Sequence, residues 1–151
     1  MLRGLRHTNI VRYLGVERVA DSVYVLEEWV PGGSVASLVA QFGPLPDSVT
    51  REYTVQALRG LVYLHSHDLI HRDVKGANML VTDDGILKLA DFGSGRGIYS
   101  KQPYTEYIST RWYRAPECLL TDGYYGPEMD LWGAGCALAT ARARARTPRG
   151  T

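Results

Sequence analysis

Short apolar runs separated by turn-forming residues mark the first third of the chain. Residues 10–14 and 23–26 are rich in β-branched and aromatic side chains, and residues 20–22 form a turn signal between them. This pattern predicts two short strands. The Pro-Gly-Gly sequence at 31–33 then breaks the chain, and a short helix is expected from about Ser34 to Phe42.

The clearest helical pattern follows two prolines, with Asp47 as the expected N-cap. Its apolar side chains recur every three or four residues and form one stripe: Val49, Tyr53, Ala57, Leu61 and Leu64. The stripe predicts a helix that packs one face against a core.

The second half of the chain mixes short strands with a long polar segment. Residues 79–81 and 86–89 are strand candidates on either side of an Asp-Asp-Gly turn. Residues 94–114 are polar and without a period, which predicts a surface loop. A last helix is expected near Pro127, and its side chains expected to face inward are Met129, Leu131, Trp132 and Cys136.

Composition is that of a soluble globular protein, with 45% hydrophobic and 22% charged residues. No apolar run is long enough to cross a bilayer, and the first residues lack the apolar stretch of a secretory signal. The net charge of +1 does not favour a nucleic-acid-binding domain. Cys118 and Cys136 have no paired spacing, which favours a reducing, intracellular and cytoplasmic setting, with the nucleus as the alternative.

The sequence His-Arg-Asp-Val-Lys-Gly-Ala-Asn at 71–78 concentrates chemical groups in one short segment. Asp73 can accept a proton or hydrogen bond from a substrate hydroxyl, and Lys75 can neutralise charge on a transferred phosphoryl group. Asn78 and Asp91 offer oxygen ligands suited to Mg²⁺. Each residue alone has an ordinary interpretation as a packing, solvated or turn residue. Together, at this spacing, they predict phosphoryl transfer from Mg-ATP.

These motifs resemble those of the eukaryotic protein kinase superfamily over about residues 5–136. The resemblance rests on HRDVKGAN, on DFG at 91–93, on APE at 115–117 and on DLWGAG at 130–135. Lys75 is similar to the lysine of the serine/threonine branch. The implied fold class is α+β and protein-kinase-like, with a partial small β lobe of two strands and a truncated, mainly helical large lobe.

The resemblance divides the chain. Residues 1–30 are expected to be a remnant of the small lobe and hinge, residues 31–136 a partial large lobe, and residues 137–151 a disordered Ala/Arg-rich tail. Residues 7–91 resemble MEKK-type MAP kinase kinase kinases, whereas residues 91–136 resemble the MAPK/MAK/MRK overlapping kinase type. Two explanations remain open: an unusual intermediate, or a sequence that joins pieces of unlike kinases.

The resemblance also implies a nucleotide site. The backbone of Glu28 and Val30 would face adenine, and Leu80 would pack beneath the base. Glu27 then falls where kinases usually carry an apolar residue or threonine, and a carboxylate is costly to bury there. Asp130 would accept the backbone N–H groups of the His71-Arg72 segment, while Trp132 is expected to be a core residue.

Thr105-Glu106-Tyr107 resembles the dual phosphorylation motif of MAP kinases. Phosphate on Thr105 would add negative charge, for which Arg72 is the natural partner. Arg111 and Arg114 could receive a phosphate on Tyr107. The implied partners are an upstream activating kinase and a protein substrate, with no nucleic acid and no membrane. An ordinary polar loop is the alternative.

The 151 residues contain no Gly-x-Gly-x-x-Gly loop before the first strand and no Val-Ala-Ile-Lys-like lysine. The function expected by descent is therefore that of a serine/threonine protein kinase impaired by truncation. It would transfer the γ-phosphate of Mg-ATP to a protein hydroxyl. A non-catalytic interaction module and a non-functional kinase gene fragment remain the alternatives.

Overall fold

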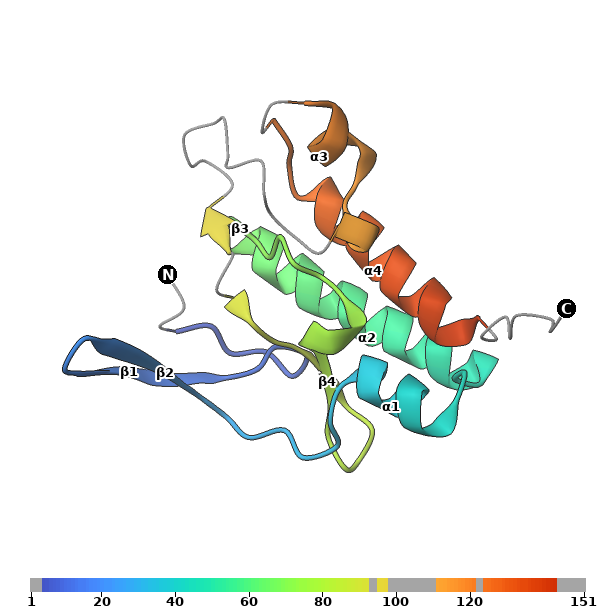
Figure 1. Ribbon diagram of the computed structural model, residues 1–151, viewed down its shortest axis with the longest axis horizontal. Coiled ribbons are helices and arrows are strands. Elements are labelled where there is room, and N and C mark those ends of the chain that lie inside the picture. The colour runs from blue at the N-terminus through green and yellow to red at the C-terminus, as the bar shows by residue number, and fades with distance from the viewer. Residues whose placement is uncertain (1–3, 93–94, 98–110, 122–123, 144–151) are drawn as a thin grey trace, which may run out of the picture.

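The computed structural model describes residues 4–92, 95–97, 111–121 and 124–143 of the chain. Two antiparallel strands, β1 (Tyr13–Val19) and β2 (Ser22–Glu27), form a hairpin. Figure 1 shows this hairpin extending away from a body of helices and short strands. The arrangement confirms the expected α+β class, with two strands on one side of a mainly helical unit.

The first strand begins later than the pattern predicted. Ile10 and Val11 are 2% and 3% exposed, and they lie in the body rather than in the hairpin. Val11 N donates to Leu89 O at 2.8 Å, and Ile10 forms an isolated parallel bridge with Leu89. The prediction of a strand over 10–14 holds for Tyr13 and Leu14 and was wrong for residues 10–12. Ile10 and Val11 anchor the chain in the core, and hairpin pairing starts after them.

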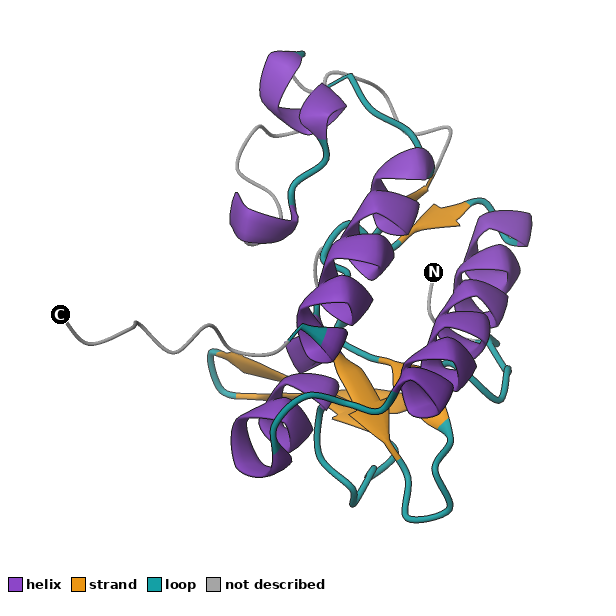
Figure 2. Cartoon of the chain, turned by 90° about the vertical axis from the view of Figure 1, so that its right-hand side faces the viewer, coloured by secondary structure: helices purple, strands orange, loops and turns teal. Residues whose placement is uncertain are grey.

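Three helices form most of the body: α1 (Val35–Phe42), α2 (Asp47–Ser66) and α4 (Glu128–Arg142). The two longer ones, α2 and α4, lie side by side (Figures 1 and 2). The predicted stripe of α2 is buried from Tyr53 to Leu64, and Val49 is half-buried. The main core therefore lies between α2, α4 and the short strands.

The start of α1 follows its sequence. The Ser34 hydroxyl accepts a hydrogen bond from Ser37 N at 3.1 Å, and the Ser37 hydroxyl accepts one from Ser34 N at 2.9 Å. The start of α2 differs from the expectation, because its N-cap is Pro46 and not Asp47. Asp47 lies inside the helix, and its carboxylate binds Arg142 of α4 through two contacts of 2.7 and 2.9 Å.

Helix α4 corrects two expectations. Leu131 and Trp132 are each 47% exposed, because the buried face follows a different set of positions: Met129, Asp130, Gly133, Ala134, Ala137, Leu138 and Ala141. The helix also continues to Arg142, past the boundary expected at residue 136. Small apolar side chains carry it on, since Ala137 and Ala141 still face the core.

Short paired strands complete the body. Strands β4 (Met79–Val81) and β5 (Leu87–Leu89) form the predicted hairpin, with Gly85 at φ +81° in its turn. Strand β3 (Leu69–Ile70) pairs with β6 (Arg96–Gly97), which falls within the segment expected to be a loop. A short helix α3 (Pro116–Leu120) lies beyond the start of α4 (Figure 1), where Cys118 Sγ is 3.9 Å from Met129 Sδ. Among the described residues, no helix is long and apolar enough to span a membrane.

Candidate functional site

Asp130 anchors the segment that carries the candidate chemistry. The residue is 1% exposed; its Oδ2 accepts from His71 N at 2.9 Å and its Oδ1 accepts from Arg72 N at 2.8 Å. The backbone of Arg72 has φ +73°, a conformation that non-glycine residues rarely adopt. A buried carboxylate that accepts two backbone N–H groups holds this unusual turn in place. The expected role of Asp130 is confirmed.

His71 ties the same segment to the residue before Asp91. Its Nδ1 accepts from Asp73 N at 3.3 Å, and its Nε2 lies 3.0 Å from Ala90 O. Because Nδ1 acts as the acceptor, the ring proton belongs on Nε2, which donates to the Ala90 carbonyl. The ring also lies 5.1 Å from that of Phe92. His71 therefore joins the two motif segments across the fold.

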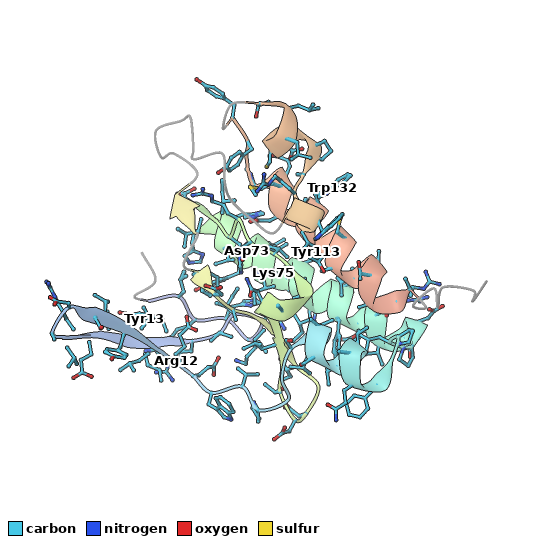
Figure 3. The ribbon with its side chains drawn as sticks, viewed as in Figure 1. Arg12, Tyr13, Asp73, Lys75, Tyr113 and Trp132 are labelled. Carbon is cyan, nitrogen blue, oxygen red and sulfur yellow. The ribbon has the colours of Figure 1, made fainter. Side chains whose placement is uncertain are left out.

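Asp73, Lys75 and Asn78 form one hydrogen-bonded group, and Figure 3 shows the labelled pair Asp73 and Lys75 next to each other. Lys75 Nζ donates to Asp73 Oδ2 at 2.6 Å. Asn78 Nδ2 donates to the same oxygen at 3.1 Å and to Asp73 O at 2.9 Å. The amide nitrogen of Asn78 is committed inside the group, so its Oδ1 is the atom left for a cation.

Asp91 lies close to Asn78 because of the β4–β5 hairpin. Met79 pairs with Leu89, and Ala90 N donates to Asn78 O at 2.9 Å. Asp91 itself is exposed, with φ +62°. One carboxylate and one amide oxygen fit Mg²⁺, which binds few protein ligands and completes its shell with waters and substrate phosphates. Among the described residues, no cluster of three or more His, Cys, Asp or Glu side chains that could hold a metal ion is present.

The expected hinge residues occupy the junction between the hairpin and the body. Val30 is 6% exposed and packs with Val11, Ala90 and the partly buried Leu80. The Glu28 carboxylate accepts from Lys88 Nζ at 2.8 Å and from Arg12 N at 2.8 Å. Burial acts to raise the pKa of Glu28, but these hydrogen bonds outweigh it and leave the pKa below its usual value.

Glu27 is half-buried at the end of β2 and is affected electrostatically by Asp91. Burial raises its pKa, and the negative charge of Asp91 raises it further. Both effects disfavour the charged form of Glu27, in line with the cost that the sequence analysis expects for a carboxylate at this position. Glu27 brings negative charge toward the residue expected to bind the metal.

The regulatory residues are described only in part. Thr105, Tyr107 and the side chain of Arg111 lie outside the described residues. Arg72 is 3% exposed, and its guanidinium lies 5.6 Å from the centre of the Tyr125 ring. Arg114 is half-buried. Their expected roles in binding phosphate stay predictions, as do the catalytic, metal-binding and nucleotide-binding roles of the residues above.

Three residues near the site were not predicted from the sequence. His65 Nε2 lies 2.9 Å from Asp130 Oδ2. Asn9, 4% exposed, donates from Nδ2 to Leu87 O at 2.8 Å and to Gln56 Oε1 at 3.2 Å. Lys88 binds Glu28, as described above. Each contact joins residues more than 45 positions apart, so no local spacing could have indicated it.

Comparisons with known proteins agree with this geometry. The family described as "Protein kinase domain" matches residues 1–148. Mitogen-activated protein kinase kinase kinase ANP1 of Arabidopsis thaliana is 47% identical over 141 residues, which cover 91% of this chain and 21% of that protein. The human MAPK/MAK/MRK overlapping kinase is 59% identical over 93 residues, which cover 62% of this chain and 22% of that protein.

The chain is also similar to a solved structure, the crystal structure of the yeast RNA Pol II CTD kinase CTDK-1 complex. It matches with a TM-score of 0.81 and 32% identity, covering 99% of this chain and 50% of that one. Resemblance to both kinds of kinase expected from the motifs is thus confirmed. The chain spans about a fifth of the length of these curated relatives.

Proposed function

Because this chain belongs to the protein kinase family, we propose that it carries the phosphoryl-transfer half of a serine/threonine kinase site. The observation that supports this most is the group formed by Asp73, Lys75 and Asn78, with Asp91 held next to Asn78 by the β4–β5 hairpin. Protein kinases generally use ATP and Mg²⁺. In this chain, Mg²⁺ would be held by Asn78 and Asp91, and it would neutralise charge on the nucleotide phosphates.

The proposed chemistry assigns a task to each residue. The Asp73 carboxylate orients a substrate hydroxyl and accepts its proton as the hydroxyl oxygen attacks the γ-phosphorus of ATP, while the bond to the bridging oxygen breaks and ADP leaves. Lys75, now 2.6 Å from that carboxylate, places its positive charge beside the transferred group. Val30 and Leu80 supply an apolar surface for the adenine, together with the backbone of Glu28. The acceptor is a serine or threonine hydroxyl of a protein.

We expect phosphoryl transfer by the 151 residues alone to be slow. They contain no glycine-rich loop to cover the phosphates and no lysine of the Val-Ala-Ile-Lys type. Loss of one electrostatic group of this kind typically lowers kcat by about 10²-fold or more. The proposed site thus holds residues for phosphoryl transfer, but these 151 residues lack the loop and the lysine that would bind the nucleotide phosphates.

The decisive experiment uses labelled ATP and a basic protein substrate. Phosphate incorporation should fall to background in Asp73→Asn, whereas Asp83→Asn, on the exposed β4–β5 turn, should leave it unchanged. Mg²⁺-dependent binding of ATP, measured by calorimetry, should weaken in Asp91→Asn and remain in Asp73→Asn. Equal incorporation by the original chain and Asp73→Asn would refute the assignment of Asp73.

Two finer proposals follow from the family. Phosphorylation of Thr105 and Tyr107 by an upstream kinase would raise activity, and phosphopeptide mapping after exposure to active MAP kinase kinases tests it. The segment Arg111 to Arg114 resembles that of proline-directed kinases, so we propose a serine or threonine followed by proline as the acceptor. Peptide pairs that differ only in that proline test this preference.

We also propose an intracellular, cytoplasmic location, which the two free thiols Cys118 and Cys136 support. Imaging of the tagged chain in cells tests it, and accumulation in a secretory compartment would contradict it. The alternative of a non-catalytic interaction module draws support from the exposed apolar side chains of the hairpin. Partner capture that persists in Asp73→Asn and Asp91→Asn would favour that alternative.

A further inference from the structure

A small cavity lies next to the residues proposed for phosphoryl transfer. Its volume is about 150 Å³, and one of its walls is Gly76, the residue that follows Lys75. The other walls come from α1, from α4 and from Tyr113, the last residue of the short helix Arg111–Tyr113 (Figure 3). Both α1 and the helix Arg111–Tyr113 contact α4. The cavity is therefore formed by the same body that holds Asp73 and Lys75.

The side chains that line this cavity carry no formal charge. Three apolar residues, each no more than 3% exposed, form its buried part: Val35, Ala137 and Ala141. The polar atoms of the lining side chains are the hydroxyls of Tyr113 and Thr140, and the Thr140 hydroxyl donates to Cys136 O at 2.8 Å. A charged side chain that entered would lose water and meet no opposite charge among the lining residues. The lining thus favours an uncharged, apolar occupant.

The size of the cavity and its opening limit that occupant further. An apolar cavity of about 150 Å³ can hold a molecule of the size of benzene. The side chains of valine, leucine and isoleucine fit this volume, whereas the indole of tryptophan is larger. Ala36 and Thr140 line the cavity and are exposed, so it opens to solvent between α1 and α4. A side chain of another molecule can enter there.

The position of Gly76 relates the cavity to the acceptor hydroxyl. Three peptide units separate Asp73 from Gly76, so their Cα atoms lie within about 11 Å of each other. An extended peptide advances about 3.3 Å per residue. A peptide whose hydroxyl reaches Asp73 therefore brings the side chains within about three residues of that hydroxyl to the cavity.

We propose that this cavity is a substrate subsite for an aliphatic side chain within three residues of the phosphorylated serine or threonine. The inference rests on the proposed kinase function, because the distance to Asp73 fixes the place of this side chain in the substrate. An aliphatic side chain gains free energy when it leaves water for the cavity. A lysine, arginine, aspartate or glutamate at the same position is disfavoured by desolvation. The lining thus adds a selectivity for sequence that Asp73 and Lys75 do not supply.

A set of matched peptides tests the subsite. All peptides share one Ser-Pro core and differ at a single position, from three residues before the serine to three after it, leaving the proline in place. That position carries leucine, tryptophan, lysine or glutamate. Fluorescence anisotropy measures binding, and labelled ATP measures the initial rate of transfer. At one of the positions, leucine should be preferred over each of the other three by about tenfold or more in binding, since apolar pockets discriminate on this scale.

Two pairs of variants link the preference to the cavity. Thr140→Glu places a carboxylate at the exposed rim, so the preference for leucine over lysine should fall about tenfold. Its control is Ala139→Glu, which is exposed on the same helix but outside the lining, and it should keep the preference. Ala36→Leu should fill the cavity and weaken binding of the leucine peptide. Its control is Ala40→Leu, exposed on α1 and also outside the lining. Far-UV circular dichroism checks that each variant stays folded.

The outcomes for the subsite and for the proposed function differ. Selective binding of the leucine peptide without transfer to any peptide would support the subsite and contradict the transfer function. Transfer at equal rates to the leucine, lysine and glutamate peptides, with equal binding, would overturn the subsite and leave the transfer function standing. Binding of no peptide would overturn the subsite, and so would an equal loss of preference in Thr140→Glu and Ala139→Glu.

Discussion

The body buries polar groups, whereas the hairpin exposes apolar side chains to water. In the body, the polar segment around His71 is buried and its backbone is held by Asp130. In the hairpin, apolar side chains such as Val23 and Tyr24 are more than half exposed. Buried polar groups with partners can hold a reactive arrangement without help from outside. Exposed apolar groups gain free energy only when another surface covers them.

The residues proposed for phosphoryl transfer and those proposed for nucleotide binding are therefore held in place by different contacts. The residues proposed to carry phosphoryl transfer receive their geometry from contacts within the body, chiefly from α4 and the β4–β5 hairpin. The residues expected to contact a nucleotide, Glu28 and Val30, lie where the hairpin meets the body. Their geometry depends on a hairpin whose own stability is marginal. Changes in the two regions should therefore differ sharply in effect.

The largest contrast is expected between two leucines. Leu61 is fully buried in α2, whereas Leu14 in β1 is 57% exposed. Leu61→Ala should lower the free energy of unfolding by about 2–5 kcal/mol, because it leaves a cavity in the core. Leu14→Ala should change it by no more than about 0.5 kcal/mol. Urea unfolding followed by circular dichroism measures both, and similar costs would mean that the hairpin is covered in solution.

The anchor of the segment 71–78 should have the next largest effect. Asp130→Ala removes the acceptor of the His71 and Arg72 N–H groups, which would be left buried. The expected loss is about 3 kcal/mol or more, since each unsatisfied buried donor costs about 1–3 kcal/mol. Hydrogen exchange should show faster exchange at these two amides than in the original chain. A loss below about 1 kcal/mol would show that the segment keeps its turn without α4.

Two glycines of α4 test how closely this helix approaches the segment 71–78. A Cβ at Gly133 would lie 2.7 Å from Val74 O, whereas a Cβ at Gly135 would meet no atom within 4 Å. Gly133→Ala should therefore destabilise the chain by about 1–3 kcal/mol. Gly135→Ala should stabilise it by about 0.5–1 kcal/mol, because alanine favours the helix. Thermal unfolding compares them, and equal effects would contradict the close approach.

The sequence predicted some of this arrangement and could not predict the rest. The motif at 71–78 and the Asp-Asp-Gly turn are local signals, so they indicated the candidate site segment and the hairpin that returns to Asp91. Leu131 and Trp132 were wrongly expected to face the core, because an apolar side chain alone does not show which face of α4 is buried. His65, Asn9 and Lys88 escaped because their partners are distant in sequence. The exposed state of the hairpin depends on tertiary context that no strand pattern contains.

The smallest effect is expected where the two regions meet, at Glu27. Burial and the charge of Asp91 raise its pKa above the usual value in the folded chain. Protonation is therefore favoured by folding, and Glu27 stabilises the fold below its unfolded pKa, an effect that is lost as the pH rises through the raised folded pKa. Glu27→Gln should remove this pH dependence and unfold at slightly higher urea concentration at pH 7. The matched control is Glu17→Gln, on the exposed part of β1. A Glu27→Gln chain that is less stable than the original at pH 7 would mean that the carboxylate has a favourable partner, so that the junction is held by charge and not merely tolerated.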